Sequence, residues 1–209
     1  MRSKRIPFEE GTLYHLFNHG NAADNLFKED DNYWFFLRKF QKYVSPIADT
    51  FAYCLMPNHF HCLIKTKTKA SIRSNLLVQI DAPSARIDKW LCKLEEDYNK
   101  FFGFQLSNFF NSYSKSFNKK YQRKGRLFLP SVDRRLVDTV DYQLHLVCYI
   151  HCNPVHHGFV SQIEDWPYSS FESVQNGLGD WLKSQAVLNW FGGKDGYNTC
   201  HKEFLKRCL

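Results

Sequence analysis

The chain has 209 residues, enough for one domain or one domain with an appendage, and 44% of them are hydrophobic. Aromatic residues make up 17%, so the chain can bury enough apolar surface to offset the entropy of ordering, which excludes wholesale disorder. Its 28 Lys and Arg residues exceed the 21 acidic residues, and the resulting net charge of +7 favours a polyanionic partner, above all a nucleic acid.

The sequence favours a cytoplasmic location. No window approaches the roughly 18 uncharged apolar residues of a transmembrane helix, and no apolar stretch follows the basic residues near Met1. The cysteines are odd in number and include no CxxC pair, which fits reduced thiols better than a disulfide framework.

The N-terminal part predicts a strand followed by a helix. Residues 12–18 (TLYHLFN) read as a strand that ends at Gly20. A helix opens after residue 28 with acidic residues at its positive dipole end, and its apolar residues recur every four positions until Pro46 stops it. His19 and Asn21 follow the strand, where they can approach a bound ligand or form an ordinary turn.

A predicted hairpin carries the sharpest functional signal. Two strands, 51–56 and 59–65, flank a Pro57-Asn58 turn. Because alternate residues of a strand face the same side, about 6.6 Å apart, His59 and His61 can converge on one divalent ion. The alternative is a pair of packed, half-exposed histidines, and the residues alone leave both interpretations open.

The second half of the chain is predicted to be mainly helical. Residues 68–103 are treated as an insertion or lid, in which the stretch IDKWLCKLEEDYNKFF (87–102) reads as helical. A strongly periodic helix covers 106–121, and a further helix runs from about 139 to 152, where Asn153-Pro154 ends it. The last 30 residues contain one or two short helices.

Tyr113 is a candidate nucleophile on the helix 106–121. It shares an apolar stripe with Phe109, Phe110 and Phe117, so the simplest interpretation is a core tyrosine whose hydroxyl has a partner. A catalytic role requires its hydroxyl at the helix edge, where a metal or base can activate it.

A basic run follows Tyr113 with no acidic residue inside it. Phe117, Tyr121 and Phe128 interleave with the cations, and this mixture suits the phosphates and bases of single-stranded nucleic acid better than a merely solvated face. Six cations are the candidate DNA contacts: Lys115, Lys119, Lys120, Arg123, Lys124 and Arg126. Arg134 and Arg135 lie beyond the run.

Four segments in this order resemble the single-tyrosine HUH transposases, specifically the REP-associated tyrosine transposase-like branch. They are YHLFNHGNAADNLF (14–27), FAYCLMPNHFHCLIK (51–65), LSNFFNSYSKSFNKKYQRKGRLF (106–128), and YIHCNPVHHGFV with DWPYSSF (149–160 and 165–171). HUH denotes His, a hydrophobic residue and His, which His59-Phe60-His61 matches.

The resemblance implies an α+β, ferredoxin-like domain over residues 1–171, with a central antiparallel sheet flanked by helices and a small helical C-terminal extension over 172–209. It also implies a metal-dependent endonuclease and strand transferase for single-stranded DNA. In that chemistry His59 and His61 bind Mg²⁺ or Mn²⁺, and Tyr113 forms a 5′-phosphotyrosine link and releases a 3′-hydroxyl. Hairpin DNA is the expected partner, and either a monomer or a homodimer is compatible with the resemblance.

One departure from the family pattern concerns the third metal ligand. Relatives often supply it at the fourth residue after the tyrosine, which here is Phe117, a side chain that cannot bind metal. Asn118 is next and is the candidate third ligand, although water or substrate oxygens can also complete the shell. The loss of that ligand motivates an alternative function, a DNA-binding protein on the same fold that does not cut.

Overall fold

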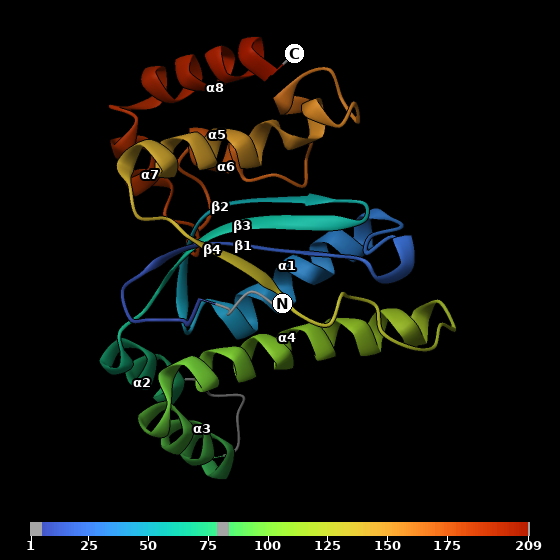
Figure 1. Cartoon of the computed structure of the whole chain (residues 1–209), viewed down its shortest axis with the longest axis vertical. Helices are drawn as coiled ribbons and strands as arrows, with labels where there is room; N and C mark the ends of the chain where they lie inside the picture. The colour runs from blue at the N-terminus through green and yellow to red at the C-terminus, as the bar shows by residue number, and fades with distance from the viewer. Residues whose placement is uncertain (1–5, 79–83, 209) are drawn as a thin grey trace.

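The computed structural model describes residues 6–78 and 84–208. Its centre is one antiparallel sheet with strand order β2-β3-β1-β4 (Figure 1). The strands are β1 (Leu13–His19), β2 (Ala48–Met56), β3 (His59–Thr66) and β4 (Asp133–Leu136). The hairpin β2-β3 was predicted, whereas the short edge strand β4 was not.

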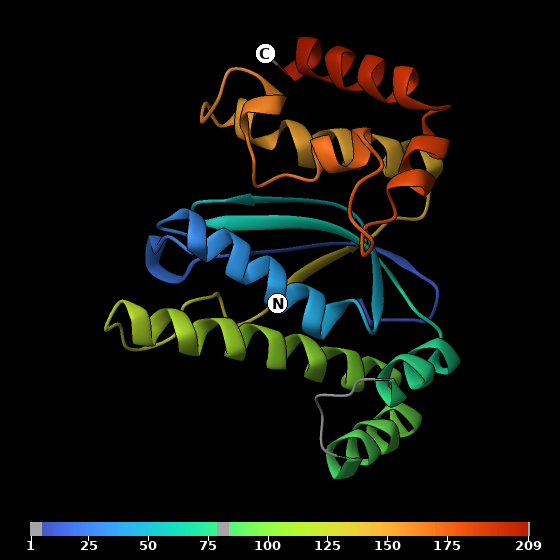
Figure 2. The same cartoon turned by 180° about the vertical axis from the view of Figure 1, so that it is seen from behind.

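Two long helices, α1 (Asp30–Val44) and α4 (Tyr98–Lys120), cover one face of the sheet (Figures 1 and 2). A core of aromatic side chains fills the space between them and the sheet: Phe36, Phe60, Phe109 and Phe128 pack against one another there. With the connections β1-α1-β2-β3-α4-β4, this arrangement confirms the predicted α+β, ferredoxin-like class.

The other face of the sheet lies beneath α5 (Val140–His156), which crosses β2 and β3 (Figure 1). Three C-terminal helices complete this layer: α6 (Phe171–Gln175), α7 (Ser184–Trp190) and α8 (Lys194–Cys208). Helix α8 packs on α5, α6 contacts α5 through Phe171 and His151, and α7 packs on α6, α8 and β2. Short 3-10 turns occur at Asn21–Ala23 and Ile163–Asp165. The sheet therefore separates two distinct helical layers.

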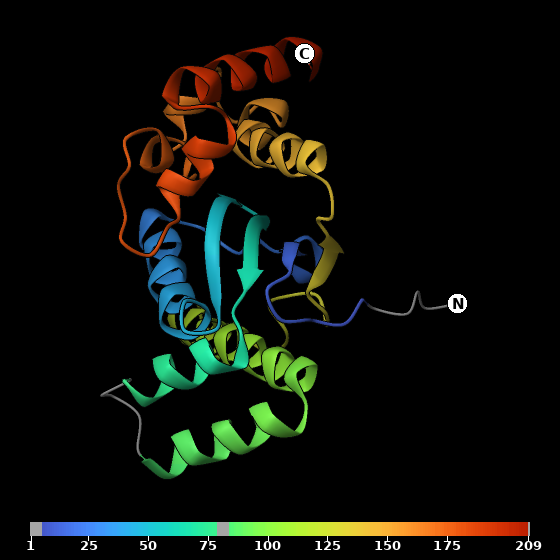
Figure 3. The same cartoon turned by 90° about the vertical axis from the view of Figure 1, so that its left-hand side faces the viewer.

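The described part of the region predicted as an insertion or lid is helical, as expected for 87–102, and residues 79–83 lie outside the described residues. The described part forms α2 (Lys69–Leu77), α3 (Ser84–Glu96) and the first turns of α4 (Figure 3). The helix predicted from 106 begins at Tyr98 because the Asp97 side chain accepts a hydrogen bond from the Lys100 amide, at 2.9 Å, and caps the helix.

Helix α5 also extends past its predicted end. Asn153-Pro154 was expected to stop it, but the helix continues to His156, with Pro154 in its last turn, where the loss of one backbone hydrogen bond leaves little helix to disrupt. The chain leaves the helix at Gly158, whose φ is 71°. In the described part of the chain, no helix is long and apolar enough to cross a membrane.

Candidate active site on the histidine face of the sheet

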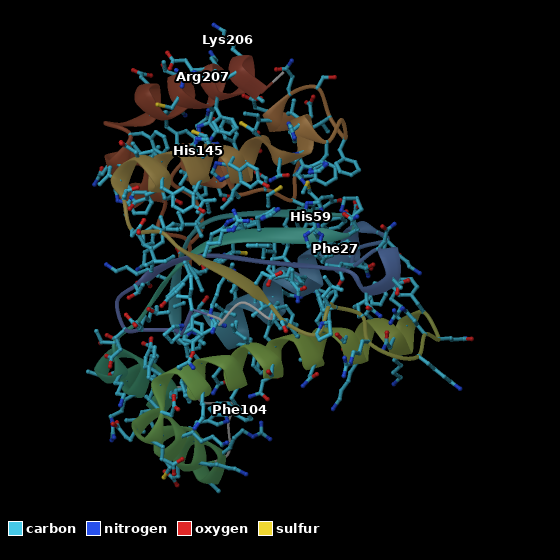
Figure 4. The ribbon with its side chains drawn as sticks, viewed as in Figure 1. Phe27, His59, Phe104, His145, Lys206 and Arg207 are labelled. Carbon is cyan, nitrogen blue, oxygen red and sulfur yellow. The ribbon has the colours of Figure 1, made fainter. Side chains whose placement is uncertain are left out.

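The two histidines of the HUH motif lie at the start of β3 and point to the same side of the sheet. Their ring centroids are 5.2 Å apart, and both side chains are buried. Figure 4 shows His59 on the side of the sheet that faces the α5 layer. The intervening Phe60 points to the opposite face, where it contacts Phe36 and Phe110. The predicted alternation is therefore correct.

The neighbouring strand β1 adds two more histidines to this side. His15 Nε2 lies 2.9 Å from His61 Nδ1, and the His19 ring stacks on the His59 ring at 4.8 Å. His157, at the C-terminal end of α5, has its ring 5.4 Å from that of His59. We call this surface, formed by His15, His19, His59, His61 and His157, the histidine face.

Tyr149 of α5 reaches the histidine face and was missed in the sequence analysis. Its ring centroid is 5.4 Å from that of His61 and 6.1 Å from that of His15. The side chain is partly exposed, and among the described residues its hydroxyl has no hydrogen-bond partner. It is therefore a phenol close to the HUH histidines and available to a ligand.

Asn153 stands one helical turn after Tyr149. Because residues four apart share a helix face, Asn153 lies between Tyr149, which contacts His61, and His157, which contacts His59. Its side chain is 1% exposed, and its Oδ1 has no partner within the described structure. An orphaned buried acceptor is costly unless a ligand pairs with it.

Burial keeps the imidazoles of His59 and His61 neutral. Burial first, and neighbouring histidines second, lower the pKa of His59 to about 4 and that of His61 to about 2. Asn58 Oδ1 accepts a hydrogen bond from His59 Nδ1 at 2.7 Å, which leaves the Nε2 lone pair of His59 for a ligand. A neutral, oriented imidazole is the form that binds metals.

The residues present fit a divalent cation. Two imidazole nitrogens and one amide oxygen form a mixed donor set of the kind that Mn²⁺ accepts, and Mg²⁺ accepts the oxygen. In residues 6–78 and 84–208, no group of three His, Cys, Asp or Glu side chains could hold a metal ion. A site at the HUH histidines therefore depends on an amide or on substrate oxygens to complete it.

The structure places Tyr113 on the other side of the sheet. Its side chain is 1% exposed, its ring packs against Phe27, Phe36 and Phe128, and its hydroxyl donates to Leu26 O at 2.6 Å. Burial raises its pKa. The catalytic interpretation required this hydroxyl at the helix edge, so the core interpretation is the correct one for its position.

Asn118 also lies away from the histidine face, near the end of α4. Its amide donates to Gly125 O at 2.9 Å, and its oxygen accepts from Arg123. Both groups thus fix the turn that follows the helix. The structure does not bring this candidate third ligand to His59 and His61.

The basic run divides into structural and free cations. Lys120 pairs with Glu29, and Arg123 pairs with Asp24. Four exposed cations have no ion pair in the described structure: Lys115, Lys119, Lys124 and Arg126. Arg135, on β4 opposite His15, is exposed beside the histidine face, with its guanidinium 5.7 Å from the Phe17 ring.

Comparisons with known proteins agree with the resemblance in the motifs. No family model matches the chain. A Haemophilus influenzae protein named "Putative REP-associated tyrosine transposase" is 28% identical over 123 residues, 59% of this chain and 58% of that protein. The REP-associated tyrosine transposase of Escherichia coli is 52% identical over 42 residues, 20% of this chain and 25% of that protein. Neither match reaches two thirds of the relative's length.

A solved structure of a REP-associated tyrosine transposase bound to a REP hairpin has the same fold. The superposition covers 86% of this chain and 88% of that chain, with a TM-score of 0.54 and 22% sequence identity. In sequence and in fold, this chain is thus similar to the REP-associated tyrosine transposases, which confirms the resemblance drawn from its motifs.

Proposed function

We propose that this chain is a metal-dependent endonuclease and strand transferase for single-stranded DNA, with Tyr149 rather than Tyr113 as its nucleophile. One observation carries the proposal: the free phenol of Tyr149 and the HUH histidine His61 meet on one face of the sheet. Names of the relatives and the shared fold support a DNA-processing role.

His59, His61 and Asn153 would hold the metal ion. When bound, Mg²⁺ or Mn²⁺ would polarise the scissile phosphate and stabilise its developing charge. The Nε2 atom of His61 would serve as a ligand in the tautomer whose Nδ1–H donates to His15 Nε2, and the 2.9 Å contact between these two nitrogens is compatible with that tautomer. Asn153 Oδ1 would gain the partner that it otherwise lacks.

The chemical step exchanges one phosphate ester for another. The Tyr149 hydroxyl oxygen attacks the phosphorus and forms a new P–O bond, while the P–O3′ bond breaks. The proton of the phenol ends on the O3′ atom, which leaves as a 3′-hydroxyl, and the downstream strand stays on the tyrosine as a 5′-phosphate ester. Because the phosphodiester is exchanged for a phosphotyrosine ester and is not hydrolysed, a 3′-hydroxyl can attack the phosphotyrosine and reverse the step without ATP.

We further propose hairpin-forming single-stranded DNA as the substrate. The net charge of +7 and exposed Arg135 beside the histidine face support a polyanionic ligand. The solved relative is described as bound to a REP hairpin. The predicted homodimer stays a prediction, to be tested by sedimentation of the protein with and without DNA.

The alternative of a non-cutting DNA-binding protein loses its main support. It rested on Phe117 at the fourth position after Tyr113, where a ligand was expected. Asn153 occupies the fourth position after Tyr149, so the spacing that appeared to be lost is present in α5.

Covalent trapping tests the proposal. The protein is incubated with end-labelled hairpin DNA and Mn²⁺ and run on a denaturing gel, and we expect a labelled protein band. Tyr149→Phe and His59→Ala should abolish the band, while the matched variant Tyr113→Phe should retain it. A band lost in Tyr113→Phe but kept in Tyr149→Phe would restore Tyr113 as the nucleophile, and DNA binding with no band under any metal would support the non-cutting alternative.

A further inference from the structure

A large groove opens on the side of the molecule away from the histidine face. It lies among α1, α2, α3 and α4 and has a volume of about 1450 Å³ (Figure 3 shows these four helices). Sites for single small molecules usually span about 300–1,000 Å³. The size therefore suits a segment of a chain molecule better than one small metabolite.

Among the described residues that line the groove, every charged side chain is a cation. These cations come from three helices, and none of the described residues that line the groove is Asp or Glu. Arg38, Arg86, Lys89 and Lys115 are exposed and form no ion pair within the described structure. Because unpaired cations gathered on facing helices repel one another, the groove is electrostatically complementary to a polyanion.

Aromatic side chains interleave with these cations. Tyr43 of α1, Trp90 of α3 and Phe104 of α4 line the groove, and all three are partly exposed. Phe104 lies between α4 and α3, where the Lys93 ammonium sits 4.7 Å from its ring centroid (Figure 4). Accessible rings beside unpaired cations can stack bases while the cations neutralise phosphates.

Gln105 gives an independent sign of a missing ligand. It lines the groove, yet it is only 2% exposed, and its Nε2 has no hydrogen-bond partner within the described structure. Its Oε1 accepts from the Asn108 amide at 3.4 Å. A buried amide donor is rarely left unpaired in a folded protein, and a base carbonyl or a phosphate oxygen can satisfy it.

We propose that this groove is a second DNA-binding site, which holds a single-stranded segment outside the hairpin while the histidine face acts on the scissile phosphate. The identity of the ligand as DNA rests on the proposed function. That the groove binds a ligand is supported independently by its unpaired cations, its aromatic rings and the unpaired amide of Gln105. In this arrangement α2 and α3, which belong to the region predicted as an insertion or lid, supply one wall of the binding site.

Binding measurements test the second site without requiring cleavage. Fluorescence anisotropy would compare a labelled hairpin with the same hairpin carrying a single-stranded tail, in EDTA and in the Tyr149→Phe background. The double variant Arg86→Glu/Lys89→Glu changes two exposed side chains of α3. The matched control, Lys202→Glu/Lys206→Glu, makes the same charge change at two exposed positions of α8.

We expect the wild-type groove to increase affinity for the tailed hairpin at least tenfold over the blunt hairpin. Arg86→Glu/Lys89→Glu should remove that advantage and lower the salt dependence of tail binding by about 1.4 in log–log slope, from two lost phosphate contacts at about 0.7 each. The α8 control should keep the advantage. Equal losses in the two double variants would show only a general charge effect and would overturn the proposal.

Gln105→Leu supplies a second variant that is independent of charge. Leucine has a similar volume and no orphaned donor, so the melting temperature should not fall, whereas tail affinity should drop several-fold. Unchanged tail affinity would remove Gln105 from the site.

A competition experiment tests the identity of the ligand. If polyglutamate competed as strongly as single-stranded DNA, the groove would bind anionic polymers in general, and DNA would be overturned as its ligand. Since no readout uses the covalent band, failure of the proposed chemistry leaves this test valid.

Discussion

The rings of Tyr149 and His61 lie 5.4 Å apart, at an interplanar angle of 77°, where helix α5 crosses strand β3. Tyr113 lies in the core between the sheet and the α1/α4 layer, and its hydroxyl is bonded to the backbone. The two helices that carry these tyrosines are on opposite sides of the sheet (Figure 1). Position relative to the sheet therefore distinguishes a tyrosine near the histidines from one that stabilises the fold.

The first prediction separates the two tyrosines by stability. Tyr113→Phe removes the buried hydroxyl that pairs with Leu26 O, so the free energy of unfolding should fall by about 1–2 kcal/mol. Tyr149→Phe removes a hydroxyl that has no partner within the described structure, and its stability should change by less than about 0.5 kcal/mol. Urea titration followed by circular dichroism measures both.

The combination with covalent trapping makes this prediction decisive. Tyr113→Phe should lose stability and keep the labelled band, whereas Tyr149→Phe should lose the labelled band and keep its stability. If Tyr149→Phe proved as destabilising as Tyr113→Phe, loss of its band could reflect misfolding, and the assignment of the nucleophile would have to rest on a different measurement.

The second prediction concerns metal binding by the histidine face. A ligand that binds only the folded state at 100 times its dissociation constant stabilises it by about 2.7 kcal/mol, so Mn²⁺ should raise the melting temperature of the wild type. The rise should vanish in His59→Ala and shrink clearly in Asn153→Ala, because each variant removes one proposed donor. Differential scanning fluorimetry over a series of Mn²⁺ concentrations gives the comparison.

His145→Ala is the control for the metal experiment. His145 is an exposed histidine on the same helix as Asn153, but it packs against Phe204 of α8 and lies away from His59 (Figure 4). This variant should keep the full Mn²⁺ response. A response that survives in both His59→Ala and Asn153→Ala would place the metal elsewhere.

Local patterns predicted the parts of this structure that depend on local rules. The alternation of His59, Phe60 and His61 follows from strand geometry alone, and the hairpin follows from the Pro57-Asn58 turn. Which helix covers that face is set by the path of the whole chain. The apolar stripe that drew attention to Tyr113 marks the buried side of α4, so its strong period indicated the core.

The signal for Tyr149 was nonetheless present in the sequence. Tyr149 and Asn153 have the spacing of a tyrosine and a ligand one helical turn apart, inside a segment that already matched the family. Tyr149 lay inside the predicted helix 139–152, but Asn153 fell just past its predicted end, so the pair was not seen on one helix face. The edge strand β4, with only four residues, has no readable alternation. The end of α5 and the existence of β4 both depend on tertiary contacts, which short-range sequence rules do not capture.

The third prediction tests the contact between the end of β1 and the β2-β3 turn, which positions His59. Gly20 follows β1, and its amide donates to Asn58 O, at 2.7 Å, in the turn just before His59. A Cβ at Gly20 would lie 2.0 Å from Asp24 O, so Gly20→Ala should force the backbone to shift and cost about 1–3 kcal/mol. Gly103→Ala in α4 is the control, since a Cβ there meets nothing within 4 Å and should stabilise the helix by about 0.5–1 kcal/mol.

The fourth prediction is a pH dependence of stability from a buried histidine pair between α5 and α8. His201 Nδ1 donates to Tyr197 O at 2.7 Å, so its Nε2 accepts the proton that His151 Nδ1 donates across 2.9 Å. His151 Nε2 in turn accepts from the Ser170 hydroxyl at 2.8 Å. Every ring nitrogen is satisfied only while both imidazoles are neutral.

Burial lowers the pKa of His201 to about 4 and holds the pKa of His151 well below 6.5. Between pH 6.5 and 4 the unfolded chain therefore binds protons that the folded chain does not, and the free energy of unfolding falls as the pH falls. The stabilisation is complete above about pH 7, and His201 alone accounts for a loss of about 3 kcal/mol by pH 4. Urea titrations at half-unit steps should show a shallower slope for His201→Gln than for the wild type, and equal slopes would mean that this pair does not titrate on unfolding.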